Sequence, residues 1–488
     1  MQNPSIPTCP FPIRMIITEQ DIISAAPLSI ITLTSLVVLT IESLKDKSED
    51  VTCWVSIIGM VAAAMVSLGS MDTAGLAYVG MISTGGYANF FAFVFCLAGV
   101  LSVMLSKAYI AKHGIEHGEY YSLLLLAIAG MMLMAAAADL VVFFLGLELM
   151  SVSFYVLAGF ARKRLVSNEA ALKYFLLGAF ATGFLLYGIA LVYGTTGTTN
   201  IASIIAQSSS LAADTIFLIG LALLLIGLAF KIAAVPFHMW VPDVYEGAPT
   251  TISGFMSTGG KAAAFSAILI IFTPVLLSVV DSLRESLAAI AVLSMVVGNV
   301  VAISQSSIKR MLAYSSIAHA GYILIGVVAG NTAGSNGVLF YLVAYTVMNV
   351  GAFGVLSMLE SKDGQNLAFD DYAGLSSKNP ILAGLMALFM FSLTGIPPFA
   401  GFFGKYYVFA GAIEAGYTWL AVIGVLMSVV SAYYYLRLVV LMYFKEQISI
   451  IDVPGFNIGM VALVISALAI VGLGVFPTVV LDLTAYFF

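Results

Sequence analysis

The chain has 488 residues, of which 61% are hydrophobic and 9% are charged, and its formal net charge is −6. Soluble domains have about 25% charged residues, so this composition excludes an ordinary soluble enzyme or nucleic-acid-binding protein. Apolar runs of about 20 residues, long enough to cross a bilayer as helices, recur along the chain. They are continuous rather than alternating, which argues against a β-barrel. The sequence therefore predicts an all-α polytopic protein with the lipid bilayer as its surroundings.

The N-terminal segment before Asp21 lacks the apolar core of a secretory signal and contains four prolines, Pro4, Pro7, Pro10 and Pro12. We therefore expect no signal peptide. The three cysteines, which form no CxxC pair and no metal-type spacing, are Cys9, Cys53 and Cys96. This pattern predicts no disulfide framework, haem, iron–sulfur cluster, metal or other cofactor in this chain.

Hydropathy predicts about fourteen transmembrane helices. They are expected near residues 22–41, 51–70, 87–106, 120–138, 139–160, 169–194, 212–235, 249–279, 286–304, 308–330, 335–359, 380–411, 417–444 and 457–480. The fourth and fifth spans are separated only by the single acidic residue Asp139, so this division depends on the least sequence information.

Basic residues are concentrated in the loops that follow odd-numbered spans. They are Lys45, Lys47, Lys107, Lys112, Arg162, Lys163, Arg164, Lys309, Arg310, Lys362, Lys378 and Lys445, with Lys173 just inside the sixth span. The even-numbered loops and both ends contain only Arg14 and Arg284. By the positive-inside rule, the odd-numbered loops face the cytoplasm and both termini face outward. We expect a multi-pass protein of the cell inner membrane.

Four ionisable residues lie inside apolar spans, where an ammonium costs at least about 2.5–3.5 kcal/mol to insert. They are Glu148, Lys231, Lys261 and Lys405. Because intramembrane charges usually mark ion pathways, the sequence predicts a proton path through these residues. Arg162–Arg164 is interpreted as a topology signal, and no nucleic-acid partner is expected.

Two spans have a proline break beside a buried lysine. The seventh reaches Val235–Pro236 soon after Lys231, and the twelfth contains Gly395-Ile396-Pro397-Pro398 before Lys405. Broken helices are typical of transporters built from internal repeats. Breaks five spans apart predict two inverted five-helix repeats, helices four to eight and nine to thirteen. The expected organisation is 1–119 (helices one to three), 120–279 (first repeat), 280–444 (second repeat) and 445–488 (helix fourteen).

Glu148 and Lys231 are predicted to form a pair whose separation would let the lysine release its proton. Ser151 and Tyr155 lie on the same helix face as Glu148. A static buried ion pair, or a neutral carboxyl that only bonds a neighbouring helix, is the structural alternative.

Lys261 follows Ser257, Thr258 and a glycine pair expected to leave room for water, which suits a central relay. An outward-snorkelling lysine is the alternative. His319, with Ser315 and Tyr322 on its helix face, is expected to pass protons near neutral pH, or else to be a packing histidine. His238 and Trp240, beside Pro236 and Pro242, are interpreted as part of an interfacial aromatic belt.

Three stretches carry a family resemblance: LAFKIAAVPFHMWVPDVYEGAPT, IKRMLAYSSIAHAGY and GIPPFAGFFGKYYVF. Over essentially its whole length the chain resembles the antiporter-like subunits of respiratory complex I, the proton-pumping NADH–quinone oxidoreductase, and most closely the N-subunit family, called subunit 2 in mitochondria. The resemblance implies fourteen helices, two inverted repeats and a proton path through the residues Glu148, Lys231, Lys261, His319 and Lys405. The family's histidine motif reads SSISHAGY, whereas this chain has Ala318 before the histidine.

Lysine at position 405 differs from the glutamate of the M subunit, and the end at Phe488 differs from the L subunit, which continues into a lateral helix. The resemblance implies a non-redox subunit that couples quinone reduction elsewhere in the complex to proton movement. It also implies K-type and M-type neighbours, with quinone, flavin and iron–sulfur clusters in partner subunits. Departures in the leader and in the 70–87 loop leave the electron donor open.

Two other functions are considered. A subunit of a multi-subunit sodium/proton antiporter would share the fold and the lysines but would have no redox partner. A structural membrane spacer would only transmit conformational change, and buried charges would bring it no benefit. Neighbouring genes would separate a redox-complex subunit from an antiporter subunit, because genes for quinone-site and iron–sulfur subunits accompany only the redox complex.

Overall fold

The computed structural model describes residues 18–45, 48–278, 281–446, 455–485 and 487. The proline-rich leader with Cys9 and Arg14, the loop residue Lys47 and the terminal Phe488 lie outside the described residues.

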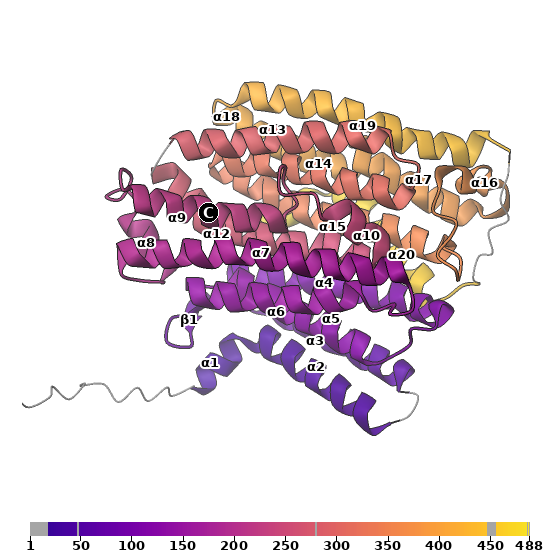
Figure 1. Cartoon of the computed structure of the whole chain (residues 1–488), viewed down its shortest axis with the longest axis horizontal. Helices are drawn as coiled ribbons and strands as arrows, with labels where there is room; N and C mark the ends of the chain where they lie inside the picture. Colours follow the sequence, from indigo (N-terminus) through magenta and orange to yellow (C-terminus); the bar gives the residue numbers. More distant parts are fainter. Residues whose placement is uncertain (1–17, 46–47, 279–280, 447–454, 486, 488) are drawn as a thin grey trace, which may run out of the picture.

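Most helices run side by side along the long axis of the molecule (Figure 1). The first half contains α1 (Glu19–Ser24), α2 (Ala26–Leu44), α3 (Glu49–Gly69), β1 (Gly75–Ala77), β2 (Ile82–Thr84), α4 (Gly86–His113), α5 (Glu119–Ala136), α6 (Leu140–Ala158), α7 (Leu165–Thr196), α8 (Ile201–Ser208), α9 (Thr215–Lys231) and α10 (Val241–Gly247). The second contains α11 (Thr250–Phe255), the π-helix η1 (Met256–Gly260), α12 (Lys261–Ser278), α13 (Asp281–Ile303), α14 (Ile308–Ala329), α15 (Thr332–Leu359), the 3₁₀ helix η2 (Phe369–Tyr372), α16 (Leu375–Lys378), α17 (Pro380–Thr394), α18 (Ala400–Glu414), α19 (Thr418–Phe444), α20 (Ile458–Val475) and α21 (Thr478–Thr484).

Twelve helices in the described part of the chain are long and apolar enough to cross a membrane. Two shorter apolar helices, α9 and α17, lie at the positions expected for the broken seventh and twelfth spans. The all-α membrane fold is therefore confirmed. The exact number of fourteen spans and the two inverted repeats stay predictions.

Both expected breaks fall beside a lysine. Helix α9 ends at Lys231, and the chain turns through Pro236 before α10 begins. Helix α17 ends at Thr394, and α18 begins at Ala400, which places Lys405 in its second turn. Proline has no backbone N–H and its ring clashes with the preceding helical turn, so neither helix continues through its proline.

The eighth span has an irregularity that the sequence did not predict. Its helix widens into the π turn η1 immediately before Lys261. The glycine pair in this turn does not leave room for water. A Cβ atom on Gly260 would lie 2.7 Å from the Phe154 ring, and one on Gly259 would lie 3.1 Å from Met131. These glycines instead let α5 and α6 pack closely against η1.

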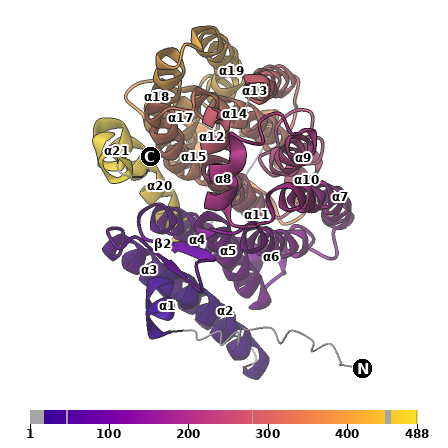
Figure 2. The same ribbon diagram turned by 90° about the vertical axis from the view of Figure 1, so that its left-hand side faces the viewer.

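Helices α11, α12, α14 and α15 lie inside the bundle, and the other spans surround them (Figure 2). The reason is clearest for α15, which contains no charged residue and is buried along nearly its whole length. A helix that is apolar all round belongs in an interior. Small residues let α18 approach it closely: a Cβ on Gly411 would lie 2.6 Å from the backbone of Gly334.

Asp139 separates the fourth and fifth spans, as predicted. Its carboxylate accepts a hydrogen bond from Val141 N at 2.8 Å and so caps the start of α6. Thr199 also donates to this carboxylate, at 2.6 Å. The short β1–β2 hairpin in the 70–87 loop lies beside this cap, where Ile82 pairs with Ala137.

Two of the expected domain boundaries fall at helix ends. The boundary at 119/120 lies at the first residue of α5, and the boundary at 444/445 lies at the last residue of α19. The boundary at 279/280 lies outside the described residues.

Candidate functional site

Lys231 is the last residue of α9, and its side chain points to α6. It is 7% exposed, and its Nζ donates to Ser151 Oγ at 2.7 Å. The Tyr155 ring lies 5.7 Å from the same nitrogen. A lysine at a helix C-terminus also satisfies the negative end of the helix dipole, so the break gives the charge a favourable local field.

Glu148 does not form the direct ion pair that we expected. Its Oε1 accepts from Thr182 Oγ1 of α7 at 2.9 Å, and among the described residues no carboxylate lies within 4 Å of Lys231 Nζ. Ser151 lies one turn after Glu148 on the same helix face, and its hydroxyl, which accepts from Lys231, donates to Leu147 O rather than to Glu148. Glu148 is half-buried rather than buried.

Lys261 is buried, which contradicts the snorkelling alternative. It is 1% exposed, and its Nζ donates to the carbonyl oxygen of Ser316 and, at 2.6 Å, to Ser316 Oγ. Both acceptors are neutral. The π turn places Lys261 at the first residue of α12, where the side chain reaches α14 in the middle of the bundle.

His319 makes two hydrogen bonds with tyrosines from different helices. Its Nδ1 lies 2.8 Å from Tyr341 OH of α15, and its Nε2 lies 3.0 Å from Tyr435 OH of α19. The Tyr435 hydroxyl also bonds to Ser315. Ring contacts connect His319 with both lysines, because its ring lies against those of Tyr345 and Tyr322, which face Lys261 and Lys405.

Lys405 satisfies the broken end of α17. Its Nζ donates to the carbonyl oxygens of Thr394 at 2.7 Å and Leu393 at 3.2 Å, and to Ser428 Oγ of α19 at 2.7 Å. The last carbonyls of a helix have no partner within it, so the break itself creates the acceptors that hold this lysine. The Tyr322 ring lies 4.9 Å from Nζ.

Polar and ring contacts link the lysines over only part of the predicted line. Lys261 bonds Ser316, and its Nζ lies 5.7 Å from the Tyr345 ring, which in turn lies 5.0 Å from the His319 ring. The His319 ring also lies 5.7 Å from that of Tyr322, beneath Lys405.

Between Lys231 and Lys261 the contacts are apolar. Phe154 of α6 lies against Gly260 and packs edge to face on Phe255, with ring centroids 5.6 Å apart. The structure thus brings Lys261, His319 and Lys405 together. Phe154 and Phe255, the Phe154 layer, separate Lys231 from them.

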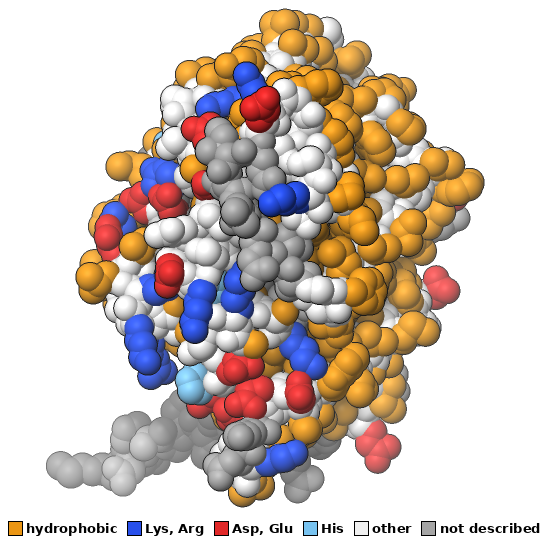
Figure 3. Space-filling view, turned by 90° about the vertical axis from the view of Figure 1, so that its right-hand side faces the viewer, with side chains coloured by type: hydrophobic (Ala, Val, Ile, Leu, Met, Phe, Trp, Pro, Cys, Tyr) orange, Lys and Arg blue, Asp and Glu red, His pale blue; other side chains and the backbone are white. Residues whose placement is uncertain are grey.

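Charged side chains gather on one end of the bundle (Figure 3), and a second group of buried charges includes Glu360 and Lys309. Glu360 follows the last residue of α15, and its side chain is 0% exposed. It accepts from Arg164 Nη1 at 3.3 Å and from Thr250 Oγ1. Lys309, interpreted from the sequence only as a loop charge, is fully buried and donates to Ala248 O at 2.7 Å.

Burial by itself would raise the pKa of the Glu360 carboxyl. The Lys309 charge and the Thr250 hydrogen bond outweigh it, so this pKa lies below its ordinary value of 4.5. Sequence reasoning missed this residue because a carboxylate at the end of an apolar run has the pattern of a loop residue.

Trp240 does not belong to an interfacial belt. It is 3% exposed, stacks on Tyr174 with centroids 4.5 Å apart, and donates from Nε1 to Phe230 O at 3.1 Å. It therefore fixes the chain after the α9 break against α7.

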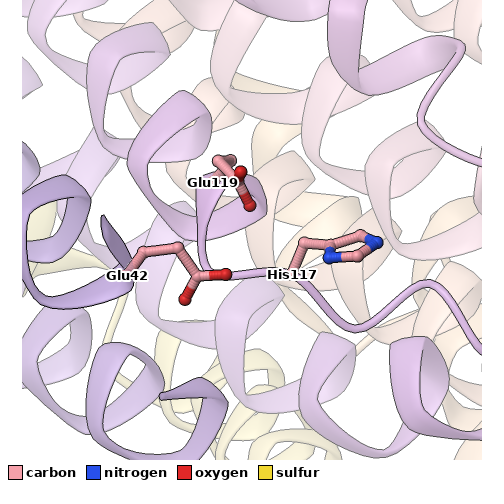
Figure 4. A group of neighbouring side chains, drawn as sticks. All are labelled: Glu42, His117 and Glu119. Carbon is pink, nitrogen blue, oxygen red and sulfur yellow. The ribbon is translucent and has the colours of Figure 1, made fainter. Parts of the chain in front are cut away.

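One group of side chains in the described part of the chain has metal-ligand chemistry: Glu42, His117 and Glu119, whose ligand atoms lie within 4.8 Å of one another (Figure 4). His117 and Glu119 are exposed, and Glu42 already accepts from Ser48. Exposed acidic groups of this kind are common without an ion, and we assign it no role.

Residues 137–431 match the family described as NADH:quinone oxidoreductase/Mrp antiporter, transmembrane. The chain belongs to this family. Among its members, NADH-quinone oxidoreductase subunit N of Trichlorobacter lovleyi is 49% identical over 442 residues, which cover 90% of each chain. The family assignment predicted from the three sequence motifs is therefore confirmed, and the N-subunit resemblance agrees with this relative.

Solved structures of the family have the same fold. A chain of respiratory complex I from Thermus thermophilus, solved with bound aureothin, superposes with a TM-score of 0.81 at 34% identity, covering 93% of this chain and 98% of that one. A chain of the Mrp complex from Dietzia sp. superposes with a TM-score of 0.78 at 23% identity, covering 95% of each chain. The second similarity shows a shared fold alone.

Proposed function

We propose that this chain is a proton-translocating, antiporter-like subunit in the membrane arm of a complex I type NADH–quinone oxidoreductase. The observation that carries the proposal is Lys261. Its ammonium is buried at the centre of the bundle and bonded only to the neutral oxygens of Ser316. A buried cation without a counter-charge is costly, and a fold retains such a group where its charge state changes during function.

In this proposal Glu148, Lys231, Lys261, His319 and Lys405 form the proton path. Lys261 and Lys405 exchange protons through His319 and its tyrosine partners. Lys231 exchanges with Glu148 through the Ser151 hydroxyl, which accepts from Lys231 and would turn from Leu147 O toward the carboxylate to pass a proton on. The Phe154 layer separates the two parts, so a proton crosses it only when side chains or water rearrange.

The chain itself would carry no redox chemistry. Flavin, iron–sulfur clusters and quinone would be held by partner subunits, and neighbours of the K and M types would flank this one. The membrane would be the cell inner membrane, with both termini outside. The division into two inverted repeats, 120–279 and 280–444, is part of the same proposal and is supported by the two lysine-bearing breaks.

The test is Lys261→Met in the complete complex, in inverted membrane vesicles. Electron transfer from NADH to an artificial acceptor should be unchanged, whereas quinone-linked proton pumping should fall several-fold. Lys378→Met is the matched control, because it makes the same substitution at an exposed lysine, and it should pump normally.

Normal pumping by an assembled Lys261→Met complex would exclude the proposed role and favour the structural spacer. Pumping that requires added sodium ions would favour the sodium/proton antiporter.

A further inference from the structure

Asn349 lies in the middle of α15 with its side chain 0% exposed. Its amide nitrogen donates to Ser257 Oγ at 2.6 Å and to Tyr345 OH at 3.0 Å. Its amide oxygen has no hydrogen-bond partner among the described residues. A buried polar atom left in this way costs about 1–3 kcal/mol, and proteins normally satisfy such atoms with ordered water.

The orientation of this amide follows from its neighbours. Ser257 Oγ donates its own proton to Gly254 O at 2.7 Å, so it accepts from Asn349, and the amide nitrogen must face it. Turning the amide over would only exchange the unpartnered oxygen for an unpartnered nitrogen. In either orientation one polar atom of this side chain needs a further partner.

Lys261 has the complementary need. An ammonium group has three N–H donors, and the two hydrogen bonds of Lys261 within the described residues both go to Ser316. Ser257 precedes Lys261 by four residues, and the Tyr345 ring lies 5.7 Å from Lys261 Nζ. One of the two side chains that bind the Asn349 amide, Tyr345, therefore borders the Lys261 ammonium, and the other, Ser257, lies about one helical turn before Lys261 in the chain. A single water molecule could serve both groups.

Asn349 lies on one side of Lys261, toward the charged end of the bundle. From Ser257 the helix runs back to Thr250, which donates to Glu360. Asn349 and Glu360 are eleven residues apart on α15, about 16 Å along the helix. Helices α11 and α15 are in contact between Asn349 and Glu360: a Cβ atom on Gly254 of α11 would lie 2.9 Å from the Cβ atom of Phe353 of α15.

We propose that Asn349 holds a water molecule through which Lys261 exchanges protons with the charged end of the bundle. The water accepts from Lys261 and donates to the Asn349 oxygen. A proton leaving the ammonium moves onto this water while one of the water's own protons passes to further water molecules that lead to the charged end, where bulk water takes it up. The lysine becomes neutral and the water held by Asn349 is restored. This inference rests on the proposed function of Lys261.

Cryo-electron microscopy of the complete complex tests the site directly. An ordered water within hydrogen-bond distance of Asn349 Oδ1 is expected in the wild-type map. The water should be absent in Asn349→Leu and retained in Asn349→Asp. It should also be retained in Thr346→Val, a matched control on the same helix, because within the described residues the Thr346 hydroxyl bonds only the carbonyl oxygen of Leu342. A well-resolved wild-type map without this water would overturn the proposal, whether or not the leucine variant assembles.

Proton pumping in vesicles tests its role. Asn349→Leu should slow pumping about three- to tenfold, the change expected for one hydrogen bond, and Asn349→Asp should restore most of the rate. Thr346→Val should pump at the wild-type rate. If Lys261→Met is impaired and Asn349→Leu is not, this inference fails and the proposed function stands. If Lys261→Met pumps normally, the proposed function itself fails.

Discussion

Lys231 contacts Ser151 rather than Glu148: the lysine donates to the serine hydroxyl at 2.7 Å, this hydroxyl donates to Leu147 O, and the Glu148 carboxylate accepts from Thr182. A direct ion pair would hold both charges in place. With the lysine on the serine hydroxyl instead, each charge responds to its own neighbours, and the hydroxyl can pass a proton when it turns away from Leu147 O. The side chain that the lysine contacts is therefore as informative as the charges themselves.

This geometry predicts a graded series of effects on pumping. Lys231→Met should abolish most pumping in an assembled complex, because the protonatable group is lost. Ser151→Ala keeps both charges and should lower the pumping rate less, by about tenfold, since hydrogen bonds to charged groups contribute about 1.5–3 kcal/mol. Ser153→Ala is the control, because within the described residues the Ser153 hydroxyl bonds only the carbonyl oxygen of Leu149.

Assembly must be measured for each of these variants by native electrophoresis, because breaking buried polar contacts also destabilises the fold. An assembled Ser151→Ala complex that pumps as fast as wild type would show that the serine only fills space.

The break between α17 and α18 is held from outside by α20, and this predicts a sharp difference between two neighbouring glycines. A Cβ on Gly474 would lie 1.8 Å from Pro398 O, whereas nothing lies within 4 Å of a Cβ on Gly472. Gly474→Ala should therefore destabilise the protein by about 1–3 kcal/mol through overpacking. Gly472→Ala should be neutral or slightly stabilising, since alanine favours helices.

The measurement is the thermal unfolding temperature of each variant in detergent. Equal unfolding temperatures for Gly474→Ala and Gly472→Ala would mean that α20 does not pack against the break as closely as the structure shows.

How much of the site the sequence could predict depends on the kind of residue. Lys261 and Lys405 stand out because a charge inside an apolar run is costly, and proline marks the breaks in the chain. Their partners have no such signal. Ser316, Tyr435 and Asn349 are ordinary polar residues of apolar helices, and only the packing of α14, α15 and α19 makes them neighbours.

The same limit explains the errors. Gly259 and Gly260 were interpreted as space for water, yet the structure fills that space with Met131 and Phe154, because close helix packing and an open cavity both favour glycine. Glu148 and Lys231 were expected to touch, yet sequence spacing cannot show which side chain of α6 comes nearest to another helix.

The distribution of basic residues predicts the orientation of the chain in the membrane. A reporter inserted in the loop 162–167 should be located on the cytoplasmic side, and one fused after Phe488 should be located outside. Protease protection or reporter activity in whole cells measures both. The opposite result would reverse the orientation and, with it, the side of the membrane with which Lys261 exchanges protons through the water held by Asn349.

Glu360 predicts a pH-dependent contribution to stability. Its native pKa is lowered below the ordinary 4.5, with burial opposing the shift and Lys309 and Thr250 outweighing it. A carboxyl whose native pKa is lowered stabilises the fold fully above its unfolded pKa, and this contribution is lost as the pH falls through the native value. Glu360→Gln should therefore cost about 3–5 kcal/mol near neutral pH, as expected when one partner of a buried ion pair is removed.

The difference in unfolding temperature between wild type and Glu360→Gln should shrink as the pH falls from 4.5 through the lower native pKa, because the carboxyl is protonated first in the unfolded chain and then in the native one. Glu414→Gln is the control, since Glu414 is exposed, and it should leave the unfolding temperature nearly unchanged throughout. A Glu360→Gln difference that stays constant on acidification would mean that the glutamate stabilises the fold by shape and neutral hydrogen bonds. The charges of Lys309 and Arg164 would then be balanced by other groups.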